Sequence, residues 1–248
     1  MRQFLTPPKS IKSISFLFLL STLLSDKLAF AHRDDYIGET LVYVTLEKGE
    51  TEAEYWLDGG DRKENDSDKK VSFLSHNLAM EHGITDRWMA DGRVTIETTR
   101  HEDTVFQSAR FETRYRFFEE NEKPVDVAVS AEVNTERDEE GRQQPTIEPR
   151  LILSKDFNLL NLTLNLPEEV SLRSGKPSFT PSLGLRYNAT ELLRFGAEVR
   201  YNTRSDEGSV IPQIWFAFPH EVTLKLGYSI GFDRNEEDFA RATIEVAF

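Results

Sequence analysis

The sequence predicts an all-β protein: a closed antiparallel transmembrane β-barrel of about twelve strands that follows an N-terminal signal peptide. Three observations lead to this fold class. Apolar and polar residues alternate with a period of two from about residue 50 onward. Short and long connections alternate between the segments that carry this pattern. The longest apolar run lies near the start of the chain, in a stretch with the features of an export signal.

The first 31 residues have the three parts of a secretory signal peptide. Basic residues, the last of them Lys12, precede an apolar core over residues 14–24, and the small-x-small site Ala29-Phe30-Ala31 follows. Cleavage there leaves His32 as the mature N-terminus. The alternative, an uncleaved anchor, needs a longer core, because a membrane-spanning helix takes about 20 apolar residues.

Composition excludes several other classes of protein. Hydrophobic residues make up 38% of the chain, charged residues 29%, and the mean hydropathy is −0.49. No apolar run after residue 30 is long enough for a membrane-spanning helix, whereas a barrel strand needs only every second residue to be apolar. The absence of cysteine excludes disulfides, a lipoprotein anchor and thiolate metal sites. Without the signal peptide, 26 basic and 42 acidic residues give a net charge of −16, so nucleic acid is not an expected partner.

Residues 32–49 are predicted to form a periplasmic N-terminal extension, and residues 50–248 the barrel. The apolar stretch from Leu41 to Leu46 leaves an alternative open, in which it forms a longer first strand or a thirteenth one. A thirteenth strand would spoil the even number that brings both ends of a barrel to the same side of the membrane.

The barrel strands follow from the alternation. Between Val125 and Asn134, for example, four valines and an alanine occupy one face and mainly polar residues the other. The predicted strands cover residues 50–59, 70–82, 87–98, 104–117, 124–134, 146–156, 158–166, 179–188, 192–202, 209–218, 221–232 and 238–248. Connections such as 83–86 and 188–191 are brief, and those such as 60–69 and 135–145 are longer. This asymmetry is typical of barrels with short periplasmic turns and longer outer loops.

The chain ends in an alternating strand whose last residue is aromatic. This strand resembles the C-terminal targeting strand of bacterial outer-membrane proteins, and we expect Ile244, Val246 and Phe248 to form the assembly signal. The resemblance implies outer-membrane localisation, with outer-membrane lipid and the barrel-assembly machinery as partners. A monomer is favoured.

Charged residues of both signs lie on the faces opposite the apolar ones. In a closed barrel they would line the lumen, where pairs on neighbouring strands either tune the selectivity of an open channel or form a salt-bridged plug. The predicted lumen-lining residues are Arg93, Glu97, Arg110, Glu112, Arg114, Arg116, Glu132, Glu148, Arg150, Arg186, Glu198, Arg200, Arg241 and Glu245.

The sequence predicts no catalytic, cofactor or metal site. The five histidines form no HExxH pair, and His32-Arg-Asp-Asp at the mature N-terminus is interpreted as a solvated tail. His101-Glu102-Asp103, together with Ser108, leaves a hydrolase as a minor alternative, because a base and an orienting carboxylate must meet a nucleophile.

The segment Met80-Glu-His-Gly-Ile-Thr-Asp-Arg-Trp88 resembles a strand-turn-strand element, roughly E-aromatic-G-[IL]-T-D-R-aromatic, of poorly characterised outer-membrane proteins that include those named for phenol meta-pathway operons. His82 replaces the usual aromatic residue. Gly83 is expected to supply a left-handed turn position and Thr85-Asp86 to cap the hairpin. The resemblance implies a barrel fold and passage of small solutes, with no catalytic residues to carry over.

The predicted function is therefore a non-enzymatic outer-membrane barrel, either a narrow charge-lined channel for small solutes or a structural protein. A soluble periplasmic β-barrel or β-sandwich binding protein is the first alternative, because turning the apolar face inward preserves the alternation. An outer-membrane hydrolase is the second.

Overall fold

The computed structural model describes residues 35–63, 70–99, 104–138, 140–219, 221–232 and 238–248. The predicted signal peptide and His101-Glu102-Asp103 lie outside these residues. The strands are β1 (Thr51–Lys63), β2 (Lys70–Thr85), β3 (Trp88–Thr99), β4 (Val105–Arg116), β5 (Asp126–Arg137), β6 (Gln143–Phe157), β7 (Leu160–Ser171), β8 (Pro177–Phe179), β9 (Ser182–Asn188), β10 (Leu193–Asn202), β11 (Glu207–Phe218), β12 (Val222–Gly231) and β13 (Asp238–Ala247). Among the described residues, no helix is long and apolar enough to cross a membrane.

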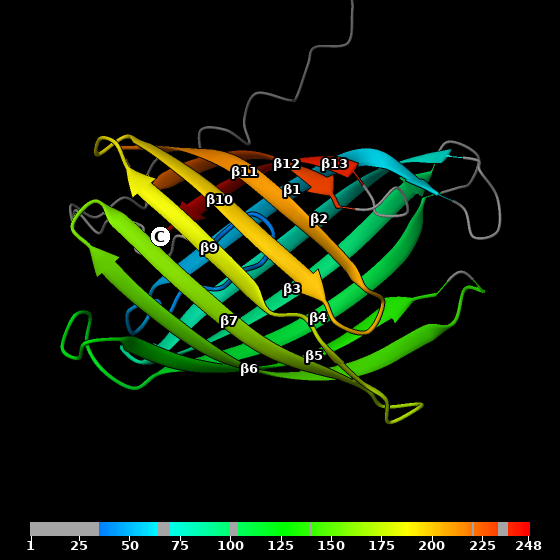
Figure 1. Ribbon diagram of the computed structural model, residues 1–248, viewed down its shortest axis with the longest axis horizontal. Coiled ribbons are helices and arrows are strands. Elements are labelled where there is room, and N and C mark those ends of the chain that lie inside the picture. Colours follow the sequence, from blue (N-terminus) through cyan, green and yellow to red (C-terminus); the bar gives the residue numbers. More distant parts are fainter. Residues whose placement is uncertain (1–34, 64–69, 100–103, 139, 220, 233–237) are drawn as a thin grey trace, which may run out of the picture.

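The strands form a closed antiparallel barrel (Figure 1). Apart from β8 and β9, each strand pairs with its neighbours in the chain, and β13 pairs with β1 to close the ring, with Ala247 opposite Glu52. Both β8 and β9 pair with β7, so within the described chain they share one of twelve positions in the ring. The break between them falls at Thr180 and Pro181, where proline has no N–H to donate to a sheet.

The predicted twelve-stranded barrel is confirmed. Every predicted segment coincides with a position in the ring, including 70–82, where His76 interrupts an apolar series. His76 lies on the outer face of β2, and its Nδ1 atom is 2.7 Å from the hydroxyl of Tyr55. The β4–β5 connection, residues 117–125, is longer than the sequence predicted.

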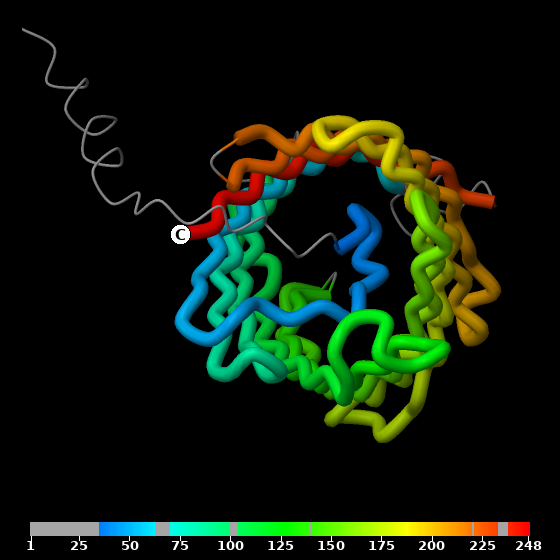
Figure 2. Tube along the Cα trace, turned by 90° about the vertical axis from the view of Figure 1, so that its left-hand side faces the viewer, coloured from blue at the N-terminus to red at the C-terminus, as the bar shows by residue number. Residues whose placement is uncertain are grey.

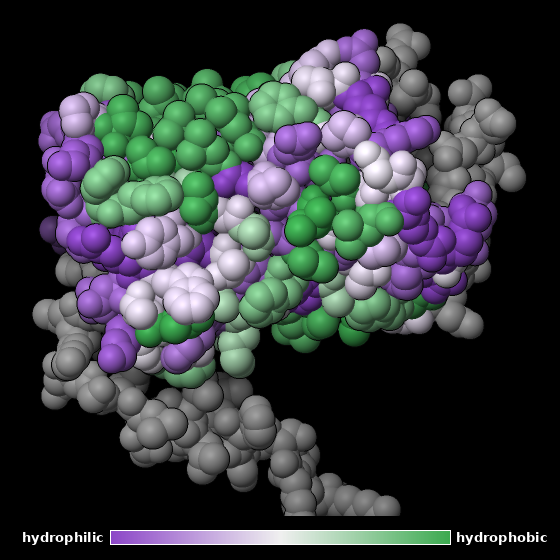
Figure 3. All heavy atoms as spheres, turned by 90° about the horizontal axis from the view of Figure 1, so that it is seen from below, coloured by the Kyte–Doolittle hydropathy of each residue, from purple (hydrophilic) through white to green (hydrophobic). Residues whose placement is uncertain are grey.

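The pleat places apolar side chains on the outside of the barrel and polar ones inside. On the outer face, the side chains of Leu78 and Phe111 are 53% and 57% exposed, whereas Glu52 and Glu81 on the inner face are fully buried. Figure 3 shows hydrophobic side chains over much of one flank and hydrophilic ones gathered toward the ends. This arrangement counts against the soluble alternative, which requires the opposite orientation.

Residues 35–49 run through the inside of the ring (Figure 2), and we call them the plug segment. Six of its seven apolar side chains are at most 2% exposed, namely those of Tyr36, Ile37, Leu41, Val42, Tyr43 and Leu46, and Val44 is partly buried. The sequence predicted an extension on the periplasmic side of the barrel, with 41–46 as an alternative strand. The described part lies within the lumen and forms no strand, because its backbone groups bond to wall side chains rather than to a neighbouring strand.

The two ends of the barrel differ. We call the end with the two-residue connections 86–87 and 158–159 the turn end, and the end with connections 138–142 and 172–176 the loop end. The plug segment leaves the lumen at the turn end, where the N–H of Gly49 donates to the carbonyl oxygen of Gly83 at 2.8 Å.

Candidate functional site

The plug segment reverses direction in a tight turn at its deepest point. The N–H of Tyr36 donates to the carbonyl oxygen of Thr40, and the N–H of Glu39 donates to that of Tyr36, both at 3.0 Å. Glu39 has a φ of 73°, in the left-handed region. A left-handed glutamate is uncommon, so the surrounding wall must hold the turn in place.

Wall side chains satisfy the polar backbone groups of this turn. The buried carboxylate of Glu198 accepts from the N–H groups of Gly38 at 2.7 Å and Thr40 at 2.9 Å. The amide of Asn165 accepts from the N–H of Leu41 at 2.9 Å and donates to its carbonyl oxygen at 2.8 Å. The side chain of Asn165 thus satisfies both backbone groups of Leu41, as a neighbouring strand would.

Arginine side chains hold the carboxylates of the plug segment. Arg114 forms a bidentate pair with Asp35 at 3.0 and 3.1 Å and also donates to the carbonyl oxygen of Val42 at 2.9 Å. Arg110 contacts Glu39 at 2.6 Å. Burial alone raises the pKa of Glu39, but the guanidinium groups of Arg110 and Arg93 outweigh this effect and hold that pKa well below its usual range. Glu39 is therefore ionised at neutral pH.

Apolar side chains of the plug segment pack against the wall at two places. Leu41 and Tyr43 pack against Ala128 and Ile152 on β5 and β6. Across the lumen, Tyr36 and Val42 pack against Trp215 on β11, with the rings of Tyr36 and Trp215 edge to face at 5.5 Å. The plug segment therefore contacts the wall on two sides of the lumen, at β5–β6 and at β11.

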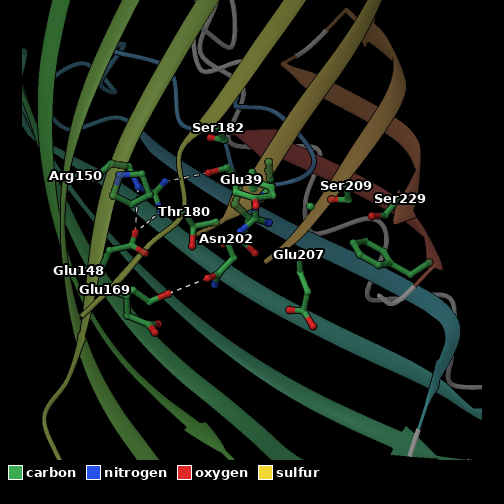
Figure 4. A pocket seen from close by; sticks show the side chains of 16 residues that line it. Glu39, Glu148, Arg150, Glu169, Thr180, Ser182, Asn202, Glu207, Ser209 and Ser229 are labelled. Carbon is green, nitrogen blue, oxygen red and sulfur yellow. Dashed lines mark hydrogen bonds and ion pairs between the residues drawn. The ribbon is translucent and has the colours of Figure 1, made fainter. Parts of the chain in front are cut away.

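A polar cavity of about 340 Å³ opens above the plug segment, and we call it the vestibule (Figure 4). It lies toward the loop end, since Asn202 and Glu207, which line it, flank the loop between β10 and β11. Glu39 of the plug segment also lines it. The remaining lining residues are Glu148, Arg150, Pro167, Glu169, Ser178, Thr180, Ser182, Arg200, Tyr201, Gly208, Ser209, Ser229 and Phe239.

The fourteen predicted lumen residues fall into groups. Six of them contact the plug segment: Arg93, Arg110, Arg114, Arg150, Glu198 and Arg241. Glu148 and Arg200, together with Arg150, line the vestibule. Others pair with wall residues: Glu97 with Arg62, Glu112 with Arg114, Glu132 with Arg110, Arg116 with Glu119, and Glu245 with Lys225. Arg186 lies over the ring of Trp215 at 5.8 Å.

Sequence reasoning missed several inward-facing charges. Asp35 and Glu39 belong to the predicted extension, and Lys225 lies in the predicted strand 221–232 but is not among the predicted lumen-lining residues. Glu52, Glu54 and Asp58 continue the period of two on β1, so strict alternation along that strand could have placed them inside.

The histidines and acidic clusters do not assemble a recognisable catalytic or metal centre among the described residues. His82 and His76 are on the outer face, where the Nδ1 atom of His82 is 2.9 Å from the hydroxyl of Thr51. The carboxylate oxygens of Glu52, Glu54 and Glu81 lie within 4.8 Å of one another. Glu54 already accepts from Trp56 and Arg93, and Glu52 and Glu81 have interactions of their own, so nothing assigns a metal to this cluster.

The expected assembly signal lies on the outside of the barrel. The side chains of Ile244 and Phe248 are 41% and 63% exposed, and Val246 shares their face. The backbones of Phe248 and Thr51 exchange hydrogen bonds of 2.8 and 3.1 Å, which extend the β13–β1 pairing.

No family model and no curated protein matches this sequence. Solved structures do. The COG4313 outer membrane channel from Pseudomonas putida F1 is 11% identical, with a TM-score of 0.63 over 83% of this chain and 98% of that one. The KdgM porin in complex with disordered oligogalacturonate is 8% identical, with a TM-score of 0.58 over 80% and 99% of the two chains. The NanC porin is 14% identical, with a TM-score of 0.54 over 77% and 98%. At such identities the likeness concerns the fold, and the chain shares the closed antiparallel β-barrel architecture of these channels.

Proposed function

We propose that this protein is an outer-membrane channel for small polar solutes, closed in the described state by its own plug segment. The observation that carries the proposal is the vestibule: a polar cavity inside a barrel with an apolar exterior, floored by a segment that is not part of the sheet. A structural protein needs neither a polar cavity nor a separate closing segment.

Several observations support placement in the outer membrane. Side chains such as Leu78 and Phe111 are exposed on the outer wall, where only lipid would cover them. Residues 1–31 are the proposed signal peptide, which leaves a mature chain of residues 32–248. Outer-membrane channels share the fold. The exposed C-terminal face of Ile244, Val246 and Phe248 suits recognition by the barrel-assembly machinery during insertion of a monomer.

The contacts of the plug segment would allow it to leave the lumen without disrupting the wall. Its backbone bonds to side chains such as Glu198 and Asn165, while the barrel strands bond to one another. Removal of the segment would therefore leave the β-ladder of the wall unbroken.

Deletion of residues 35–46, with the signal region and residue 47 onward retained, tests the proposal. We expect the purified deletion variant to give larger and longer-lived single-channel currents in planar bilayers than the full mature chain. Replacement of the loop residues 138–142 by glycine and serine is the control, because the described residues of this loop are half-buried or exposed and do not line the vestibule. A folded deletion variant that conducts no better than the full chain would show that the plug segment does not close the pore. The absence of current from both would favour a structural role.

A further inference from the structure

Acidic side chains lie directly opposite one another on six consecutive strands of the wall. The register of β1 to β6 aligns Glu52, Glu81, Asp91, Glu112, Glu132 and Glu148, each opposite the next. We call them the acidic row. Like charges directly opposite each other destabilise a sheet, so a row of this length needs a reason other than the stability of the wall.

The arginines beside the acidic row are shared with other carboxylates: Arg93, for example, lies 4.0 Å from Asp91 and 3.3 Å from Glu54. Arg114 divides its guanidinium between Glu112 and Asp35 of the plug segment, and Arg110 lies between Glu132 and Glu39 of the plug segment. The plug segment therefore brings carboxylates of its own to the same arginines. Among the described residues, twelve acidic and four basic residues are buried, and the side chains of Arg110 and Arg241, at 8% and 10% exposed, add two more interior cations. The interior carries an excess of negative charge.

The acidic row ends in the vestibule. Glu148 and Glu169 both line the cavity, and they lie next to the β6–β7 pair of Ile147 and Val170 on the two strands. Figure 4 shows both side chains on the same wall of the cavity. Glu207 adds a carboxylate at the rim. The vestibule is thus the end of the acidic row that a solute from the loop end would meet first.

The two arginines of the vestibule are already occupied. Arg150 bonds to Glu148 at 2.5 Å and donates to the carbonyl oxygen of Glu39 at 3.0 Å. Arg200 interacts electrostatically with Glu39 and Glu198. An anion entering the cavity would have to displace these carboxylates, whereas a cation would find Glu169 and Glu207 at the wall and rim.

We infer that the vestibule binds small organic cations that carry primary amines, with Glu169 as the carboxylate that receives them and Glu148, paired with Arg150, adding negative charge beside it. An ammonium group has three N–H donors and no acceptor. The carboxylates and the hydroxyls of Ser178, Thr180 and Ser209 supply matching acceptors. The cavity volume of about 340 Å³ is at the lower end of the range for small-molecule pockets. This inference names the substrate class of the proposed channel and rests on that function for its biological meaning.

Calorimetric titration of the full mature protein in detergent tests the inference independently of conduction. The probes are 1,4-diaminobutane and succinate, which have the same carbon count and opposite charge. We expect the diamine to bind and succinate not to bind. Glu169→Gln should weaken binding of the diamine by about tenfold, because it removes a charge-assisted hydrogen bond. The double variant Glu148→Gln, Glu169→Gln should weaken it further.

The matched control is Glu168→Gln. Glu168 is the neighbour of Glu169 on β7 and carries the same charge at the same height, but its side chain is exposed on the outer face. Because Glu148→Gln removes a partner of Arg150, the single variant Glu169→Gln keeps the test valid if the double variant does not fold.

Loss of diamine binding in Glu169→Gln with retention in Glu168→Gln supports the inference. It is overturned if the diamine gives no binding heat at millimolar concentration, if succinate binds equally well, or if both single variants behave alike. A protein that binds the diamine but passes no current with or without the plug segment would refute the channel function and leave the binding site in place.

Discussion

At the scale of single residues, Arg114 joins the plug segment to the wall through several contacts. Its side chain is fully buried between the wall and the plug segment. It contacts both carboxylate oxygens of Asp35, the carbonyl oxygen of Val42 and the carboxylate of Glu112. The planar guanidinium suits such a site because its donors are fixed in a fork that matches a carboxylate.

Arg114→Gln is expected to release the plug segment. Removal of one partner from a buried ion pair costs about 3 to 5 kcal/mol, which corresponds to an increase in opening of at least about 100-fold. The chain has no cysteine, so Val42→Cys introduces a single buried thiol whose reaction with a polar maleimide reports exposure. Labelling should accelerate in the Arg114→Gln background and stay slow with Arg142→Gln, which changes an exposed loop arginine. Equal rates would mean that Arg114 does not hold the segment.

The ionisation of Glu39 predicts how the closed state responds to acid. Because the pKa of Glu39 is lowered, its contribution to docking is fully present above the ordinary glutamate pKa of about 4.3. That contribution is lost only as the pH falls through the lowered value. Single-channel currents of the wild type should therefore be as infrequent at pH 5 as at pH 7, whereas Glu39→Gln should open more often at both. A wild type that behaves like Glu39→Gln at pH 5 would contradict this assignment.

At the scale of elements, the β2–β3 hairpin shows how a wall strand accommodates the plug segment. The hydroxyl of Thr85 accepts from the N–H of Arg87 at 3.3 Å, as expected for a capped turn. The prediction that Gly83 occupies a left-handed turn position is wrong, because its φ angle is not positive. Gly83 faces the lumen, and a Cβ there would overlap the carbonyl oxygen of Glu47. Glycine is required at this position because the backbone of the plug segment passes close to the backbone of β2, and not because the chain turns there.

Gly83→Ala is therefore expected to push residues 46–47 away from the wall and loosen the plug segment. Backbone atoms form the obstacle, so the clash cannot be relieved by a side-chain rotation. Gly92→Ala on the neighbouring strand β3 is the control, because a Cβ there meets nothing within 4 Å. Maleimide labelling of Val42→Cys should accelerate in the first variant and remain unchanged in the second. The reverse result would mean that the segment tolerates displacement at its exit.

At the scale of the whole molecule, the alternation of one strand decides which solvent each face meets. On β5, Val129 is 37% exposed on the outside, and Glu132 is 8% exposed on the inside. Among the described residues, every strand except the short β8 pairs with a neighbour on both sides, so the backbone groups of the wall bond to one another rather than to solvent. A barrel with this orientation is suited to a bilayer and unsuited to bulk water.

Spin labels at Val129→Cys and Glu132→Cys should report this orientation in reconstituted vesicles. The label at residue 129 should be relaxed by lipid-soluble oxygen, and the label at residue 132 should be shielded from it. The two positions share a strand and differ in the face that they occupy, so each is the control for the other. Water contact at residue 129 with shielding at residue 132 would refute membrane insertion.

Much of the wall could be predicted from the sequence because each strand carries its own signal. Alternation is a local property, so Val125 to Asn134 could be assigned to β5 without knowledge of its neighbours. The inward position of residues such as Arg114 and Glu132 followed from the same alternation. Cross-strand partners did not follow, because register depends on how the strands pair.

The sequence by itself determined the barrel, its strand number and the polarity of its two faces, because apolar and polar residues alternate along each strand. Only the tertiary structure decided that residues 35–46 lie inside the barrel and that Glu148 and Glu169 line the same vestibule above them. The physical reason is that the plug segment has no repeating pattern: its backbone bonds to side chains more than 120 residues away, such as Glu198 and Asn165. Contacts of that kind exist only after the ring has closed.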